Sequence, residues 1–221
     1  MDLHYRLMVL THILLLVFWL GTDIGVFVSA LWVKKTGRPM SERWLLLQLG
    51  GLLDVMPRLC SALMFPLGAA LARARWGLAI TPAALDVLWV VAFVWCGAIL
   101  TAYRKQNTPI AEAIGKIQLV GLAVAGAGAG AWGLVLLSND AVPTWLALKV
   151  ALFGLVYLLS IGIDATFRPA IRVLAEMPAE GGSATQEARL RSTINLCCAV
   201  VLLVYAIVLA SGALGTLKSP R

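Results

Sequence analysis

The sequence predicts an all-α membrane protein, a single domain over residues 1–221 built as a bundle of about six transmembrane helices. Hydrophobic residues make up 61% of the chain and charged residues only 13%, whereas soluble domains carry about 25% charged residues. The mean hydropathy is +0.89. Apolar segments recur at the length of about 20 residues that a helix needs to cross a bilayer. These observations exclude a soluble enzyme, a disordered tail and a disulfide-rich secreted module.

Each apolar segment is predicted to be a helix rather than a barrel strand. Lipid cannot hydrogen-bond to the backbone, so a spanning segment must satisfy its own polar groups, and these segments lack the period-2 alternation of strands. Their approximate ranges are 5–33, 44–73, 83–103, 110–137, 144–167 with an extension toward 175, and 190–213.

Turn chemistry separates the segments in order along the chain. Polar residues 34–39 end the first helix, 81–82 open the third, and 107–109 separate the third from the fourth. Residues 138–143 end the fourth helix, and 178–185 form the one long polar loop. Gly, Pro, Asn, Asp and Ser in these stretches are typical of helix ends and loops.

Two helices carry internal features that affect packing. Pro57 lacks the backbone N–H of a helix interior, so we expect the second helix to kink beside Arg58. The fourth helix has a face of small residues suited to close contact with another helix. Its glycines are Gly121, Gly126, Gly128, Gly130 and Gly133.

Lys and Arg counts predict the orientation, because cytoplasmic loops of membrane proteins carry more of them. One side holds Lys34, Lys35, Arg38, Arg43, Arg104, Lys105, Lys116, Arg168, Arg172, Arg189 and Arg191. The other side holds Arg6, Arg73, Arg75, Lys218 and Arg221. We expect the richer side in the cytoplasm of a bacterial inner membrane, with both termini periplasmic. Because the basic residues sit in short runs between apolar segments, nucleic acid is not an expected partner.

Ionisable residues inside a membrane are costly, and they indicate a site or a buried pair. They fall on the first, second and fifth predicted helices, which we take as the functional part of the bundle. The residues are His12, Asp23, Asp54, Arg58, Lys149, Asp164 and Arg168. At 1.5 Å per residue, His12 and Lys149 share an outer layer, and the other five lie in the inner half.

The inner layer is predicted to be a buried charge network of Asp23, Asp54, Arg58, Asp164 and Arg168. Asp54–Arg58 and Asp164–Arg168 have the i,i+4 spacing at which opposite charges meet on one helix. We favour an ion-pair network that locks three helices together over a proton pathway, which remains an alternative.

His12 has two open interpretations: a ligand for a cofactor, or a structural hydrogen-bonding residue. Imidazole is the commonest protein ligand of haem iron and also suits copper. A second axial ligand would come from Met8, Met56 or a partner, or the position would be open. Lys149 is expected either to pair with a propionate of the cofactor or to reach the outer interface. The candidate cofactor-binding residues are His12, Lys149, Arg58 and Trp19, with His12 as the metal ligand.

The motifs around these residues resemble the CopD-like and HemJ-like membrane proteins. His12 followed by 18–21 (FWLG) resembles their "H…W-x-G" opening, and 57–59 with 65–68 is similar to their second helix. Residues 145–150 resemble the "W-L-x-x-K" helix of the HemJ-like group. That resemblance implies a haem-associated protoporphyrinogen oxidase in which His12 and Lys149 are functional. The CopD-like side implies copper uptake.

The leading hypothesis is therefore a protein that binds a b-type haem or related tetrapyrrole through His12 and acts in membrane redox chemistry, with a HemJ-like oxidoreductase as the candidate enzyme class. Copper transport through His12 and the inner acids is the first alternative. The second is a scaffold or accessory subunit in which the glycine face of the fourth helix docks a partner. A homo-oligomer or a membrane redox partner is compatible with each.

Overall fold

The computed structural model describes residues 2–217, which form seven helices and no strand. The helices are α1 (Leu3–Val33), α2 (Met40–Leu53), α3 (Val55–Trp76), α4 (Pro82–Arg104), α5 (Pro109–Ser138), α6 (Thr144–Ala175) and α7 (Ala184–Thr216). With α2 and α3 taken as one span, six helices are long and apolar enough to cross a membrane. The predicted all-α membrane bundle is thus confirmed.

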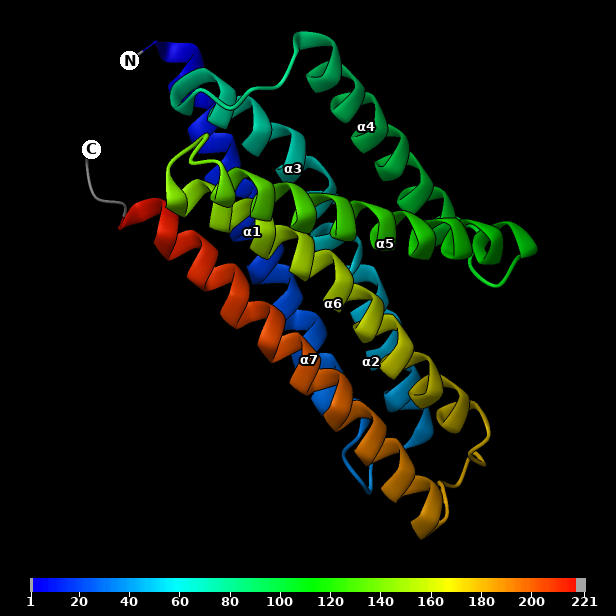
Figure 1. The fold of residues 1–221 in the computed structure, drawn as a ribbon. Coiled ribbons are helices and arrows are strands. Elements are labelled where there is room, and N and C mark those ends of the chain that lie inside the picture. The colour runs from blue at the N-terminus through cyan, green and yellow to red at the C-terminus, as the bar shows by residue number, and fades with distance from the viewer. Residues whose placement is uncertain (1, 218–221) are drawn as a thin grey trace.

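The second span is broken at Asp54, between α2 and α3 (Figure 1). Pro57 follows three residues later and has no N–H to donate to the carbonyl of Leu53. Losing that hydrogen bond, together with the proline ring's clash with the preceding turn, accounts for a break one turn before the proline. The structure therefore has a helix break where the sequence predicts a kink.

Two helices, α2 and α7, begin at least one full turn earlier than predicted. α7 begins at Ala184 rather than near 190, because Ser183 and Gln186 form a capping box: each side chain hydrogen-bonds to the backbone of the other. This pairing satisfies backbone donors that the start of a helix leaves free. α2 begins at Met40, directly after Pro39, and so includes residues that the sequence placed in a loop.

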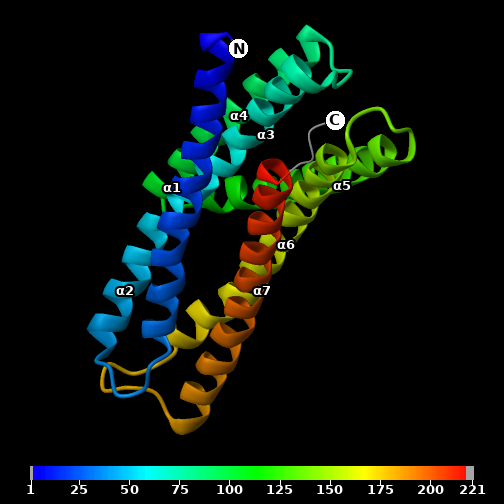
Figure 2. The same ribbon diagram turned by 90° about the vertical axis from the view of Figure 1, so that its left-hand side faces the viewer.

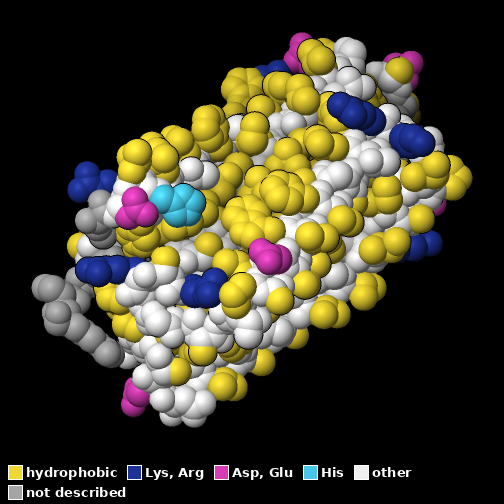
Figure 3. Space-filling model, turned by 90° about the horizontal axis from the view of Figure 1, so that it is seen from above, with side chains coloured by type: hydrophobic (Ala, Val, Ile, Leu, Met, Phe, Trp, Pro, Cys, Tyr) yellow, Lys and Arg dark blue, Asp and Glu magenta, His cyan; other side chains and the backbone are white. Residues whose placement is uncertain are grey.

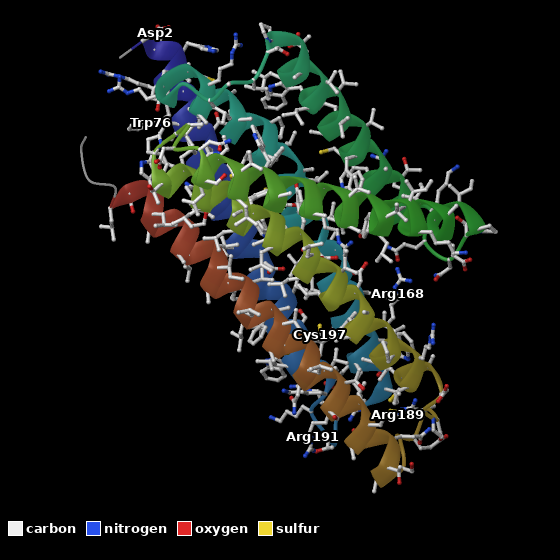
Figure 4. The ribbon with its side chains drawn as sticks, viewed as in Figure 1. Asp2, Trp76, Arg168, Arg189, Arg191 and Cys197 are labelled. Atoms are coloured by element: carbon white, nitrogen blue, oxygen red, sulfur yellow. The ribbon has the colours of Figure 1, made fainter. Side chains whose placement is uncertain are left out.

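The start of α1 and the last residues of α7 lie at one end of the bundle, together with the α3–α4 and α5–α6 turns. The α1–α2 and α6–α7 turns lie at the other end (Figures 1 and 2). The turns and helix ends at the second end carry more Lys and Arg residues than those at the first. Figure 4 shows Arg168, Arg189 and Arg191 toward the second end and Asp2 and Trp76 at the first. Lys218 and Arg221 lie outside the described residues.

The helices pack in two groups. In the N-terminal group, α1 lies against α2 and α3, and α3 lies against α4; in the C-terminal group, α6 lies between α5 and α7. Figure 2 shows α1 and α2 on one side and α6 and α7 on the other, and Figure 1 shows α5 crossing the remaining helices at a steep angle. Backbone contacts between the groups are few, so side chains carry most of that interface.

The outside of the bundle is apolar. Figure 3 shows hydrophobic side chains spread over the face seen from above. On α4, for example, Val87, Val90 and Val94 are all more than half exposed. Exposed apolar surface on this scale is unfavourable in water but matches the hydrocarbon core of a bilayer. A lipid bilayer is therefore the environment that the surface fits.

The glycine face of the fourth predicted helix, now α5, packs against α6 within the chain. A Cβ atom at Gly126 would lie 2.9 Å from the carbonyl oxygen of Gly154, and one at Gly133 would meet the backbone of Ala151. The two backbones therefore approach as closely as small residues allow. The predicted packing role is seen at Gly126 and Gly133, whereas Gly121 faces Trp95 of α4 and a Cβ atom at Gly128 would meet open space.

Candidate functional site

The inner layer is organised around the guanidinium of Arg58. Its Nε donates to Asp54 Oδ2 at 2.6 Å, and its Nη2 donates to Asp164 Oδ1 at 3.2 Å. Arg168 Nη2 lies 3.9 Å from the second oxygen of Asp164. Arg58 of α3 thus links Asp54, at the break in its own span, to Asp164 of α6. The i,i+4 spacing of Asp54 and Arg58 favours the contact between these two.

Neighbouring hydrogen bonds extend this link between the two groups of helices. The Tyr157 hydroxyl on α6 donates to the backbone oxygen of Ser61 on α3 at 3.1 Å. The Ser61 hydroxyl in turn donates to the backbone oxygen of Arg58 at 2.9 Å. Arg58 and Ser61 therefore connect α3 to α6 through one charged and one neutral contact.

A cavity of about 740 Å³ lies beside the charge network. Its walls come from every helix. They include α4, α5 and α7, which lie outside the three spans predicted to form the functional part of the bundle. The Arg58 side chain lines this cavity and is 40% accessible. The accessible part of the guanidinium therefore faces the hollow, and the charge network borders a space that is open along part of its surface.

Asp23 stands apart from the ion pairs. It lines the cavity from α1, close enough to Asp54 and Arg58 for their charges to act on it, but it forms no ion pair with any side chain in residues 2–217. Its near neighbour is the hydroxyl of Tyr205 on α7. The predicted five-residue network is therefore four residues joined by contacts and a fifth, Asp23, that only approaches them.

The outer layer contains His12 and Lys149, as the depth estimate predicts. The imidazole of His12 packs over Gly68 of α3, where a Cβ atom would lie 3.5 Å from its Cε1. Its Nδ1 is buried and has no hydrogen-bond partner in the described part of the chain. Lys149 of α6 is near enough for its charge to act on His12, and its side chain lies over Gly215 of α7.

The four candidate cofactor-binding residues divide between the two layers. Trp19 and Arg58 line the inner cavity, whose lining does not include His12 or Lys149. Arg58 lies ten residues before Gly68 on α3, about 15 Å along the helix at 1.5 Å per residue. Trp19 is buried between the layers, edge-on to Phe153 with ring centroids 6.1 Å apart.

The possible second ligands of a group at His12 also separate. Met56 is twelve residues from Gly68 on α3, about 18 Å along the helix, so it cannot face His12 across one iron atom. Met8 is one turn from His12 on α1.

Clusters of metal-binding side chains are absent from the part of the chain that the structure describes. Within residues 2–217 there is no group of three or more His, Cys, Asp and Glu side chains arranged to hold a metal ion. Cys197 and Cys198 are buried, and both border the inner cavity.

One buried ion pair was missed by the sequence analysis, which counted Arg43 among the loop residues. Arg43 on α2 is 1% exposed and lies 2.9 Å from Glu187 Oε1 on α7. It also donates to the backbone oxygen of Lys35 at 3.0 Å. Beside it, Lys34 donates to Asn195 of α7 at 2.5 Å. The two residues are 144 positions apart in sequence, so no local spacing predicts that they pair. Glu187 belongs to a helix only because α7 begins early, at Ala184.

Comparison of the chain with protein-family models, with curated proteins and with solved structures finds no match.

Proposed function

We propose that this integral membrane protein holds a b-type haem or a related tetrapyrrole at His12 and takes part in membrane redox chemistry. One observation carries the proposal: the Nδ1 atom of His12 is buried, yet it has no hydrogen-bond partner in residues 2–217. A buried imidazole that merely fastened helices would use its polar atoms, since buried polar groups are nearly always paired. A ligand to an added group would instead be unpaired while that group is absent.

Two neighbours of His12 support the proposal. The ring packs directly over Gly68, which keeps that side free of other side chains, and Lys149 brings a cation to the same level. A propionate near that ammonium would gain a charge-assisted contact. Haem supplies one-electron chemistry when bound, and the chain's own part is to orient the imidazole and keep water away from it. The similarity of residues 18–21 and 145–150 to the HemJ-like proteins supports the same assignment.

The orientation that we propose places the end with the α1–α2 and α6–α7 turns in the cytoplasm of a bacterial inner membrane. The sequence assigns eleven Lys and Arg residues to that side and five to the other. The His12 layer would then lie near the periplasmic face. Cysteine labelling at Thr36 and at Ala79, on opposite ends of the bundle, tests this with a membrane-impermeant reagent: only Ala79→Cys should react in intact cells.

Absorption spectroscopy with metal analysis tests the cofactor. Protein purified in detergent and supplied with haem should show a Soret band at one haem per chain, and His12→Ala should lose it. His4→Ala, an exposed histidine two turns earlier on α1, is the matched control and should keep it. Lys149→Ala should weaken haem retention without abolishing it. A wild-type protein that takes up no haem, or a His12→Ala variant that takes up as much, contradicts the proposal.

A further inference from the structure

The inner cavity has the size and lining of a binding site that is separate from His12. Its volume of about 740 Å³ falls within the roughly 300–1,000 Å³ typical of pockets for small organic molecules. Charged side chains reach it from three spans: Asp23 from α1, Asp54 and Arg58 from the broken second span, and Asp164 from α6. A space of this kind inside a membrane bundle needs an occupant or water to satisfy its charges.

The charges around the cavity do not cancel. Asp54 and Asp164 share the guanidinium of Arg58, and Asp164 has a second, longer contact with Arg168 at 3.9 Å. Three carboxylates therefore meet two guanidiniums, and the carboxylate without an ion pair is Asp23. A carboxylate without a counter-charge inside a membrane bundle is costly even where some water reaches it. It favours an occupant that brings a positive charge.

Aromatic rings flank Asp23. Trp19 and Phe27 lie four residues before and after it, so the three side chains share one face of α1, and all three line the cavity. Tyr205 of α7 does not line the cavity itself, but it packs beside this face: its ring centroid is 6.2 Å from that of Phe27 and its hydroxyl is near the Asp23 carboxylate. Aromatic faces attract cations, most strongly where water is excluded.

We propose that the inner cavity binds a monovalent organic cation with an apolar body, its charge held by Asp23 between Trp19 and Phe27. Further aromatic residues, Trp95 and Tyr103 of α4 and Phe167 of α6, line the rest of the space and suit an apolar body. Gln118 of α5 also borders it, with a buried Nε2 atom that has no partner in residues 2–217. That nitrogen can donate to a polar group on the occupant.

The charge and aromatic arrangement favours this class over the other occupants that fit by size. An anion would meet Arg58, but Asp54 and Asp164 already occupy that guanidinium, and Asp23 would repel it. A small inorganic cation would leave the aromatic walls without contact. An amine or quaternary ammonium with hydrophobic substituents uses both features at once.

Binding of a matched pair of probe ions tests the proposal. Tetraphenylphosphonium and tetraphenylborate have nearly the same size and shape and opposite charge, so their difference isolates the charge preference of the site. Equilibrium dialysis of each ion against the purified protein, with protein-free micelles as background, should show saturable binding of the phosphonium alone at one per chain. Equal binding of both ions, or no saturable phosphonium binding, overturns the proposal.

Variants of the chain assign the binding to Asp23. Asp23→Asn should weaken phosphonium binding at least tenfold, and Asp23→Glu should restore most of it. Asp86→Asn, at an exposed carboxylate of α4 that does not line the cavity, should bind as the wild type does. Phe27→Leu provides a second variant that keeps the charge, with a loss of about threefold or more expected from the missing ring. Folded Asp23→Asn and Phe27→Leu proteins that both bind normally contradict the site.

The haem proposal and the cation proposal can be tested independently, because they concern different residues. Asp23→Asn leaves the His12 layer intact, so it should retain any haem that the wild type binds. His12→Ala should bind tetraphenylphosphonium normally, because His12 does not line the cavity.

Discussion

Two helix interfaces in this bundle are built in opposite ways. Between α5 and α6, glycine meets backbone, with Gly126 and Gly154 in near contact and no polar side chain needed. Between the N-terminal group and the C-terminal group, long side chains span the gap: Arg43 to Glu187, Arg58 to Asp164 and Tyr157 to Ser61. The first interface leaves no space, whereas the second borders a partly open cavity of about 740 Å³.

The difference shows how one chain separates rigidity from binding. Close packing of small residues in lipid gains its stability from van der Waals contact and leaves no room for a ligand. Long polar side chains reach across a wider gap and leave room between the helices, as the cavity beside Arg58 shows. We therefore expect the α5–α6 pair to behave as one rigid unit and the interface between the groups to be where ligands act.

The largest effect is expected from Gly154→Leu. A side chain at this position meets the backbone of α5 at Gly126 and Gly130, so the two helices must separate. Overpacking a core typically costs about 1–3 kcal/mol and occasionally more. Because the atoms met here are backbone and cannot give way, we expect a loss of unfolding free energy larger than that of any other variant below. Gly128→Leu, which places the same side chain in open space on α5, is the control. Denaturant titration in detergent compares the two, and equal stability would show that the α5–α6 contact is not tight.

Arg43→Ala should follow in size. Arg43 is 1% exposed and paired with Glu187, so its removal leaves a carboxylate unpaired between α2 and α7. Breaking a buried ion pair from one side typically costs about 3–5 kcal/mol. Arg189→Ala, an exposed arginine of α7, should change the unfolding free energy by less than about 0.5 kcal/mol. A loss as small as this control's would place Arg43 among the dispensable surface charges.

Arg58→Ala should cost less than Arg43→Ala although it leaves two carboxylates without their shared partner. Its side chain is 40% accessible, and water in the cavity would solvate Asp54 and Asp164. Allowing for that screening, we expect a loss of about 1–2 kcal/mol. Arg168→Ala, with a 3.9 Å contact and 55% exposure, should cost less still. If Arg58→Ala destabilises the protein more than Arg43→Ala, the cavity is dry.

The smallest effect is expected from Tyr157→Phe, which removes only the 3.1 Å hydrogen bond to the Ser61 backbone. Side-chain hydrogen bonds between membrane helices average about 0.6 kcal/mol. Tyr103→Phe is the control, since that hydroxyl has no hydrogen bond within residues 2–217 and the ring also borders the cavity. The same unfolding titration should separate the two variants by about 0.6 kcal/mol; no separation would mean that the neutral contact contributes nothing to joining the groups.

The sequence predicted the spans because long apolar runs in lipid have one outcome, the helix. It also predicted features with a local period: the pairing of Arg58 with Asp54 follows from i,i+4 spacing, and the break near Pro57 follows from a missing donor. The cavity and the Arg43–Glu187 pair were not predicted, because they depend on how separate helices are placed. The early start of α7 had a local signal, the capping pair Ser183 and Gln186, which the sequence analysis did not use.

Asp54 combines two tasks that most membrane helices assign to different residues. It is the residue at which the helix of the second span is interrupted, and its carboxylate accepts from Arg58 Nε at 2.6 Å. Any event that neutralises this carboxylate or draws Arg58 away would also remove a contact at that interruption. The junction between α2 and α3 is thereby linked to what occupies the cavity beside it.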